Sequence, residues 1–432
     1  MPAALSKETV TDEAALVEEK LARQKRVVKL MFWAVFQSVC QHMITLQSEP
    51  MLIKEICKGS ASASMQMLAN SQGLVGLLGL MLNQVGGKFS DVLGRKAGLI
   101  LGPLGNIFLG QFVYHNPGSR FVVLTCRVLR MVITTFSNTV MVTAALSDVC
   151  SGKDLAMASS LMAASTGLGL VLTPFVEARI LQRSSPRFAY LALSVLGAVQ
   201  VVYNVFVMPE TLEIAKRIPM QAALTLQNFN PFGFMRIFTH GSKGLCQMTT
   251  VATLQMAIEG KNMSDLSQVW MKNHLGWTIE GARNFVISYG MLCVASGMSL
   301  TPYLLRTLSP RAFTTLTNLF NFLGFAIRGR QGALFFILGV LPMLPGVNGS
   351  SAFALKALSS DRATAEGFGK GEFSAWSNNL RALMGSLAPV IYGNYYAFAL
   401  RKGLPAGTVF ILAGILGAGL PEVLLRFIKD ED

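Results

Sequence analysis

Gly86-Gly87-Lys88-Phe89-Ser90-Asp91-Val92-Leu93-Gly94-Arg95-Lys96 is a short polar stretch between two long apolar runs. Two helices must reverse direction over these few residues, and Gly87 and Gly94 allow close approach and unusual backbone angles. Asp91 falls at the C-terminal end of the first helix, where the helix dipole disfavours an anion. It therefore needs a cationic partner, and Arg95, four residues later, is the nearest candidate. The stretch predicts a tight, charged hairpin between two helices.

The apolar runs on both sides of the hairpin are long enough to cross a lipid bilayer. A helix rises about 1.5 Å per residue and needs about 20 residues to cross the hydrocarbon core. The runs lack the two-residue alternation of a membrane β-barrel, so helices are favoured. We predict an all-α membrane protein with 12 transmembrane helices. Windows without Asp, Glu, Lys or Arg are 30–48, 59–87, 97–119, 131–147, 155–176, 188–209, 244–258, 284–305, 312–327, 331–355, 382–400 and 403–421.

The overall composition agrees with a membrane protein. Of the 432 residues, 52% are hydrophobic and 14% are charged, and the mean hydropathy is +0.47. Because soluble domains carry about 25% charged residues, these values argue against a water-soluble enzyme, a disordered chain and a nucleic-acid binder. The net charge of +14 is explained by Lys and Arg in cytoplasmic loops. Six cysteines without CxxC spacing and four histidines predict no metal site and no cofactor.

The 12 windows divide into two sets of six. A shift of 215 residues places window 188–209 on 403–424 and Pro174 on Pro389, which suggests two halves of parallel orientation. We expect two pseudo-symmetric six-helix bundles. The predicted regions are a cytoplasmic N-terminal tail at 1–26, bundles at 27–209 and 244–428, a cytoplasmic linker at 210–243 and a C-terminal tail at 429–432.

The distribution of basic residues predicts the orientation. If both termini are cytoplasmic, more of the 37 Lys and Arg residues fall in the inside segments than in the outside segments. This excess has the sign that cytoplasmic loops normally show. We expect a multi-pass protein of the plasma membrane or an organelle membrane, with both termini in the cytoplasm.

The hairpin at 86–96, placed between the second and third of 12 spans, resembles the loop pattern of the major facilitator superfamily. That pattern is Gly-x-x-x-Asp-x-x-Gly-Arg-Lys/Arg, and Gly87, Asp91, Gly94, Arg95 and Lys96 match it. The resemblance implies the major facilitator fold. It also implies that this loop is a cytoplasmic gate motif, formed and broken as the two halves rock.

The fifth predicted span carries a second, weaker resemblance. Gly167, Gly169 and Pro174 are similar to the glycine-proline motif of drug/proton antiporters of the tetracycline-transporter-like group, although Thr173 replaces the usual glycine before the proline. Arg127 resembles the buried arginine of the fourth span in this superfamily. These residues imply an antiporter, while the altered motif leaves antiport, symport and uniport open.

Charged and polar residues inside the predicted spans are candidates for substrate binding, because such groups are costly in lipid. Arg127 and Arg130 share a face of the fourth span, and Arg381 lies in the eleventh. The sequence shows no acidic partner for them within a span. They either bind an anionic or polar substrate or bond to backbone carbonyls. The complete set of substrate-binding candidates is Arg127, Arg130, Arg381, Gln37, Gln41, Asn378 and Asn348.

Three residues are candidates for proton coupling. His42 lies in the first span and can titrate near neutral pH, although a hydrogen-bonded structural histidine is the common alternative. Glu177 and Glu259 lie at the expected outer ends of the fifth and seventh spans, where a solvated carboxylate at the membrane surface is the competing interpretation.

The sequence contains no GxSxG with triad partners, no HExxH and no Walker loop, so we expect no enzyme. We predict a monomeric secondary active transporter that moves a small solute, drug-like or organic and possibly an anionic metabolite, by alternating access. Its expected partners are this solute, protons and the lipid bilayer, with no nucleic acid. The alternative is a transport-inactive protein of the same fold that acts as a receptor or scaffold.

Overall fold

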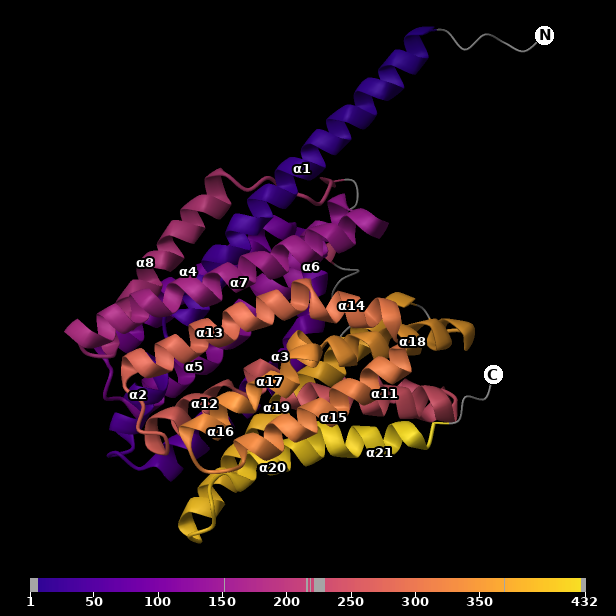
Figure 1. Ribbon diagram of the computed structural model, residues 1–432. Helices are drawn as coiled ribbons and strands as arrows, with labels where there is room; N and C mark the ends of the chain where they lie inside the picture. The colour runs from indigo at the N-terminus through magenta and orange to yellow at the C-terminus, as the bar shows by residue number, and fades with distance from the viewer. Residues whose placement is uncertain are drawn as a thin grey trace.

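A computed structural model describes residues 7–150, 152–214, 217, 219–220, 230–368 and 370–428. Within these ranges the side chains of 7–17, 83–88, 347–351 and a few shorter stretches are outside the description. The regular secondary structure of the described residues is entirely helical, as the apolar windows predict (Figure 1).

The first half of the chain folds into long helices joined by short turns. The predicted N-terminal tail, from Lys7 onward, continues directly into the first span as one helix. The elements are α1 (Lys7–Met43), α2 (Ser48–Ile56), α3 (Ala61–Leu93), α4 (Arg95–His115), α5 (Arg120–Thr135), the π-helix η1 (Phe136–Val140), α6 (Met141–Val149), α7 (Gly152–Arg183) and α8 (Arg187–Phe206).

Helices of the second half are interrupted more often. The elements are α10 (Met235–His240), α11 (Lys243–Gln255), the 3-10 turn η4 (Met256–Ile258), α12 (Gly260–Asn273), α13 (Ile279–Met298), α14 (Leu300–Thr307), α15 (Pro310–Arg328), α16 (Ala333–Leu338), α17 (Val340–Met343), the 3-10 turn η5 (Leu344–Gly349), α18 (Ser350–Ala365), α19 (Lys370–Arg401), α20 (Thr408–Gly414), the π-helix η6 (Ile415–Gly419) and α21 (Leu420–Arg426).

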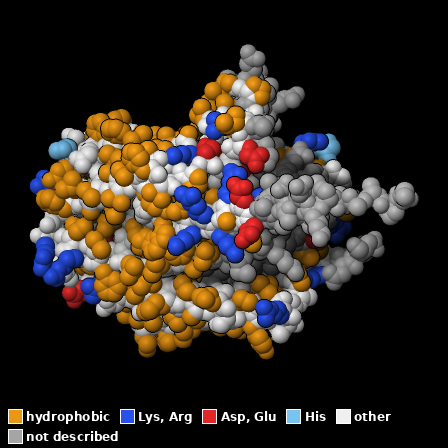
Figure 2. Space-filling view, turned by 90° about the horizontal axis from the view of Figure 1, so that it is seen from above, with side chains coloured by type: hydrophobic (Ala, Val, Ile, Leu, Met, Phe, Trp, Pro, Cys, Tyr) orange, Lys and Arg blue, Asp and Glu red, His pale blue; other side chains and the backbone are white. Residues whose placement is uncertain are grey.

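Eight described helical segments are long and apolar enough to cross a membrane. The other four predicted windows fall on α11 with η4, on α15, on the broken series α16 to α18, and on α19. Figure 2 shows hydrophobic side chains covering much of the visible face, while Lys, Arg, Asp and Glu form groups at its left edge and near its middle. This distribution fits a multi-pass protein with an apolar belt facing lipid.

The most extensive contacts between the two halves of the chain are those of α3 with α19 and of α7 with α13. Small residues allow the close approach in the first pair: a Cβ on Gly76 would lie 2.6 Å from the Cα of Ser386. Such contacts are typical of helix packing in lipid.

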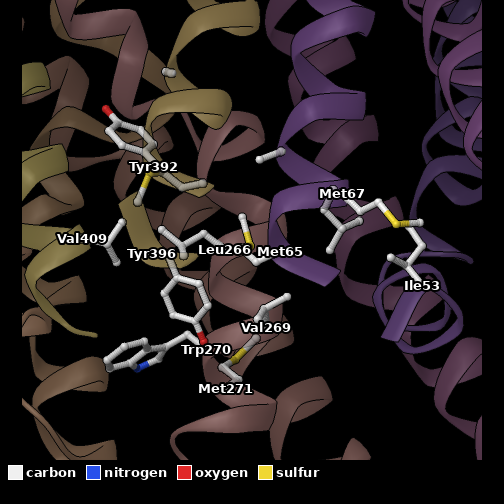
Figure 3. Packing of buried hydrophobic residues seen from close by; sticks show 14 of the residues in the cluster. Ile53, Met65, Met67, Leu266, Val269, Trp270, Met271, Tyr392, Tyr396 and Val409 are labelled. Atoms are coloured by element: carbon white, nitrogen blue, oxygen red, sulfur yellow. The ribbon is translucent and has the colours of Figure 1, made fainter. Parts of the chain in front are cut away.

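The largest apolar core lies at one end of this assembly. In Figure 1 the N- and C-terminal ends lie on the right, whereas α2, α12 and α16 lie toward the opposite side. We call that opposite side, which carries α2 and the turn 274–278, the distal end. Figure 3 shows part of its core, where Met65 of α3 lies beside Leu266 and Tyr396 of the second half, while Met67 points toward Ile53 of α2. The two halves are therefore packed tightly together at the distal end.

Candidate functional site

A buried cluster of charged residues joins the two halves beside this apolar core. The Arg127 side chain, on α5, is 0% exposed, and each of its three guanidinium nitrogens has a partner. Nε donates to Ser71 of α3 at 2.9 Å, Nη1 donates to Glu49 of α2, and Nη2 donates to Asp265 of α12 at 2.5 Å. Since α12 belongs to the second half, the Arg127–Asp265 ion pair is a charged contact between the halves.

Glu49 is the centre of the cluster on the side of the first half. Its Oε1 accepts hydrogen bonds from Arg130 Nη2 at 2.7 Å and from the Tyr190 hydroxyl at 3.0 Å. His42 lies close enough to Glu49, Arg127 and Arg130 to interact with them electrostatically. The two arginines therefore share one buried carboxylate, an arrangement that offsets part of the cost of burying their charges.

A second charged group lies at a break in the seventh predicted span. The helical path of α11 and η4 ends at Glu259, which has an extended ψ of 143°, and α12 then begins at Gly260. Glu259 accepts from Arg381 Nε of α19 at 2.9 and 3.0 Å, and Lys261 Nζ lies 3.8 Å from the same carboxylate. The side chains of Arg381 and Lys261 are 32% and 47% exposed, respectively. Two accessible cations thus share one carboxylate.

The interpretation of Glu177 and Glu259 as solvated carboxylates at the membrane surface is wrong, because both side chains are buried. Glu259 lies between α11 and α12, so the helical path continues for another 14 residues after it. Glu177 lies inside α7 and is fully buried, and its Oε1 accepts from the backbone N–H groups of Gln47 and Ser48, each at 2.8 Å. Those N–H groups open α2, so the Glu177 carboxyl group caps the N-terminus of this helix.

The polar substrate candidates are not all in one place. Gln41 lies in a buried network inside the first half, where it donates to Gln200 and accepts from Asn106 at 2.7 Å. Gln37 is half-buried on α1 and Asn378 is exposed on α19. The side chain of Asn348 lies outside the described residues.

The hairpin at 86–96 takes part in a compact polar network. Arg95 donates to Asp91 at 2.6 Å, as the spacing predicts, and to Asp148 of α6 at 3.0 Å. The Glu210 carboxylate accepts from the backbone N–H groups of Arg95 and Lys96, at 2.9 and 3.3 Å. It therefore stabilises the first turn of α4 as an N-terminal anion. These contacts all lie on the side of the first half.

Glycines of both motifs make close contacts. Gly94 has a φ of +99°, which L side chains rarely adopt, and an added Cβ would collide with Glu210. Gly167 of α7 faces Val294 of α13, whereas Gly169 faces Val39 of α1. Pro174 lies within α7. The fifth-span motif therefore contacts the second half through Gly167.

Four acidic residues and one lysine of these networks were missed as candidates. Each apolar window stops at the first charged residue. A carboxylate that directly follows a window therefore falls outside the predicted span, even when it lies inside the membrane assembly. Glu210 directly follows the sixth window, which ends at Pro209, so its place next to a helix end was visible in the sequence. The missed residues are Glu49, Lys261, Asp265, Asp148 and Glu210.

The helical fold, apolar belt and buried ion pairs define a multi-pass integral membrane protein. The family model described as Major Facilitator Superfamily matches residues 31–425. The chain therefore belongs to this superfamily. No sequence among the curated proteins matches it.

Solved transporter structures share the fold. The human organic anion transporter MFSD10 (TETRAN) is 17% identical, with a TM-score of 0.66 over 93% of this chain and 99% of that one. The nucleoside transporter NupG is 12% identical with a TM-score of 0.67, covering 94% of this chain and 100% of the other. A POT family transporter in complex with 5-aminolevulinic acid is 12% identical with a TM-score of 0.67, covering 93% and 95%. The family and these neighbours support a membrane transporter.

Proposed function

We propose that the chain is a secondary active transporter that moves a small organic anion by alternating access between two six-helix bundles of 12 spans in total. The observation that carries this proposal is the pair of cations, Arg381 and Lys261, that share Glu259 at a helix break inside the membrane assembly. Broken helices and accessible charges at such depth are costly in lipid unless they line a solute pathway.

The two charged groups have different roles in this proposal. Arg381 and Lys261 are partly accessible cations that both face Glu259, so they suit an anionic solute. Arg127 is fully buried and its three nitrogens are occupied. Its ion pair with Asp265 instead holds the halves together at the distal end, in a state that is closed on that side.

Proton coupling follows from competition for Arg381. A proton on Glu259 would neutralise the carboxylate and release Arg381 for the anionic group of the solute, whereas loss of the proton would restore the ion pair. Binding of proton and solute would then favour one another. Among the three proton-coupling candidates, Glu259 alone contacts a proposed solute-binding cation through an ion pair between described residues.

The name of one structural neighbour is compatible with this substrate class, because that protein is an organic anion transporter. The membrane orientation remains as the basic residues predict, with both termini in the cytoplasm and the distal end facing the other side.

Flux measurements test the proposal. Purified protein in proteoliposomes is offered a panel of labelled mono- and dicarboxylates and their neutral amide analogues, with and without a pH gradient. We expect accumulation of at least one carboxylate, driven by the gradient. Arg381→Gln should raise the KM for that carboxylate at least tenfold, and Glu259→Gln should remove the gradient dependence.

Arg401→Gln is the matched control, because Arg401 lies exposed in the last turn of the same helix. It should leave the flux unchanged. An equal effect of both arginine variants, or no carboxylate flux in any condition, would contradict the proposal.

A further inference from the structure

The first helix continues far beyond the membrane. α1 has 37 residues and is about 55 Å long, whereas about 20 residues cross the hydrocarbon core. In Figure 1 its N-terminal part projects beyond the other helices. Part of α1 must therefore lie in the aqueous phase next to the membrane.

Contacts of α1 with its neighbours indicate where it leaves the lipid. Gln24 Nε2 donates to Cys150 Sγ, directly after the end of α6. The Leu30 carbonyl accepts a hydrogen bond of 2.9 Å from the Tyr203 hydroxyl in the last turn of α8. Trp33, a few residues further along α1, is 44% exposed, and tryptophan is enriched at the boundary between lipid and water. The segment before Trp33 therefore emerges from the lipid at the level where α6 and α8 end.

Five basic side chains surround this emerging segment of α1. All five are exposed, and none has an ion-pair partner within the part of the chain that the structure describes. Since successive helix residues are about 100° apart, their spacing distributes them around the helix and does not form a single stripe. The exposed Glu18 and Glu19 lie only at the outer edge of the group. We call the five residues the basic collar: Lys20, Arg23, Lys25, Arg26 and Lys29.

The depth of the collar divides it into two parts. Lys25, Arg26 and Lys29 lie about 6–12 Å outside Trp33 along the helix axis. The headgroup region is about 5–7 Å thick on each side of the bilayer, and long basic side chains can extend back toward it. The other two residues of the collar lie about 15–20 Å outside Trp33, beyond the headgroups, where salt screens their charges. The inner three are therefore the residues that can reach lipid phosphates.

We propose that the basic collar binds the phosphate groups of anionic phospholipids, chiefly through Lys25, Arg26 and Lys29. Basic clusters directly outside a membrane span attract anionic lipids, and each additional Lys or Arg strengthens the attraction. A guanidinium can donate two parallel hydrogen bonds to a phosphate, and an ammonium attracts it as a point charge. Bound lipid holds α1, and with it the packed helix α7, at a fixed depth in the bilayer. Lipid binding of this kind does not depend on transport.

Trp33 itself can report which lipid lies next to the collar. Purified full-length protein is reconstituted into phosphatidylcholine with a varied fraction of phosphatidylglycerol, and the acyl chains of one lipid carry bromine, which quenches the fluorescence of nearby tryptophans. The chain has four tryptophans, and the Trp33→Phe variant gives the signal of the other three. The difference between the two proteins is the quenching at Trp33, and it yields the binding of each lipid there relative to the other.

We expect the anionic lipid to be preferred at least threefold next to the collar, with a preference that decreases as sodium chloride is added. The triple collar variant, Lys25→Gln with Arg26→Gln and Lys29→Gln, should remove this preference. The double variant Lys20→Gln with Arg23→Gln should retain most of it, because these two residues lie beyond the headgroups.

A matched variant at the distal end controls for net charge. Lys58→Gln, Arg401→Gln and Lys402→Gln together remove three exposed positive charges and should leave the preference unchanged. No preference for phosphatidylglycerol, a preference that survives in the triple collar variant, or an equal loss in the distal variant would overturn the proposal. So would binding of a soluble polyglutamate peptide to the collar without a lipid preference, which would assign the surface to an acidic protein.

Discussion

Three buried polar groups surround Glu49, and each depends on its negative charge. Arg127 and Arg130 donate to separate oxygens of this carboxylate, and Tyr190 donates to one of them. Asp265, in contrast, has one cationic partner here, and its side chain is 20% exposed. Removing the negative charge should therefore cost more stability at Glu49 than at Asp265.

Glu49→Gln should destabilise the protein more than Asp265→Asn. The first change leaves two buried arginines without their shared anion, and breaking a buried pair costs about 3–5 kcal/mol. After the second change Arg127 still retains Glu49. Unfolding of the purified variants, followed by thermal denaturation, gives the ranking. Equal melting temperatures, or a larger loss for Asp265→Asn, would show that Glu49 is not the centre of the cluster.

The sequence indicates which arginines are buried but does not indicate their partners. Arg127 and Arg130 stand out because apolar residues surround them, whereas Glu49 lies between two windows and Asp265 follows a helix break. Partner choice depends on how α2, α5 and α12 pack, and spacing along the chain contains no information on contacts between residues 138 positions apart.

At the scale of elements, the hairpin at 86–96 was predictable because its interactions are local. Asp91 and Arg95 are four residues apart, and Gly94 occupies a backbone region that favours glycine. The contact between Glu210 and Arg95 was harder to predict, because Glu210 follows α8 and lies 115 positions after Arg95 in the sequence. The break at Glu259 was missed because the apolar window ends at 258, just where the helix changes direction.

Asp91→Asn should impair transport while leaving expression largely intact. The change removes the ionic partner of Arg95 on α3, although Asp148 still accepts from Arg95 Nε. The contact between α3 and α4 would weaken without unfolding the first half. Initial uptake rates in proteoliposomes and protein yield measure the two effects. Full uptake at wild-type yield would argue against a gating role for this pair.

Gly94→Ala should reduce thermal stability by about 1–3 kcal/mol, because Gly94 has a φ of 99° and a ψ of 161°, a backbone region that is essentially restricted to glycine. Gly118→Ala is the control, since it lies in a turn with no atom within 4 Å of an added Cβ. The two variants carry the same chemical change, so their difference in melting temperature isolates the backbone and steric cost. Equal melting temperatures would contradict the tight turn.

At the scale of the whole molecule, the halves are in contact through α3 and α19, and the alternating access that we propose would require that contact to change. The close approach near Gly76 and Ser386 leaves no room for a side chain, and the neighbouring atoms are largely backbone. Backbone cannot move aside as a flexible side chain can. A methyl group at Gly76 should therefore disfavour the distally closed state without damaging either half.

Gly76→Ala should shift the protein toward a distally open state, and Gly79→Ala on the same helix should not, because an added Cβ at Gly79 meets nothing within 4 Å. A cysteine at Val269, which is 5% exposed in the apolar core of the distal end, reports the change in a Cys57→Ser background. Its reaction with a membrane-impermeant maleimide should be at least several-fold faster in Gly76→Ala. The same rate in both glycine variants would mean that α3 and α19 do not separate at this point, and the distal closure would then have to open elsewhere, along α7 and α13.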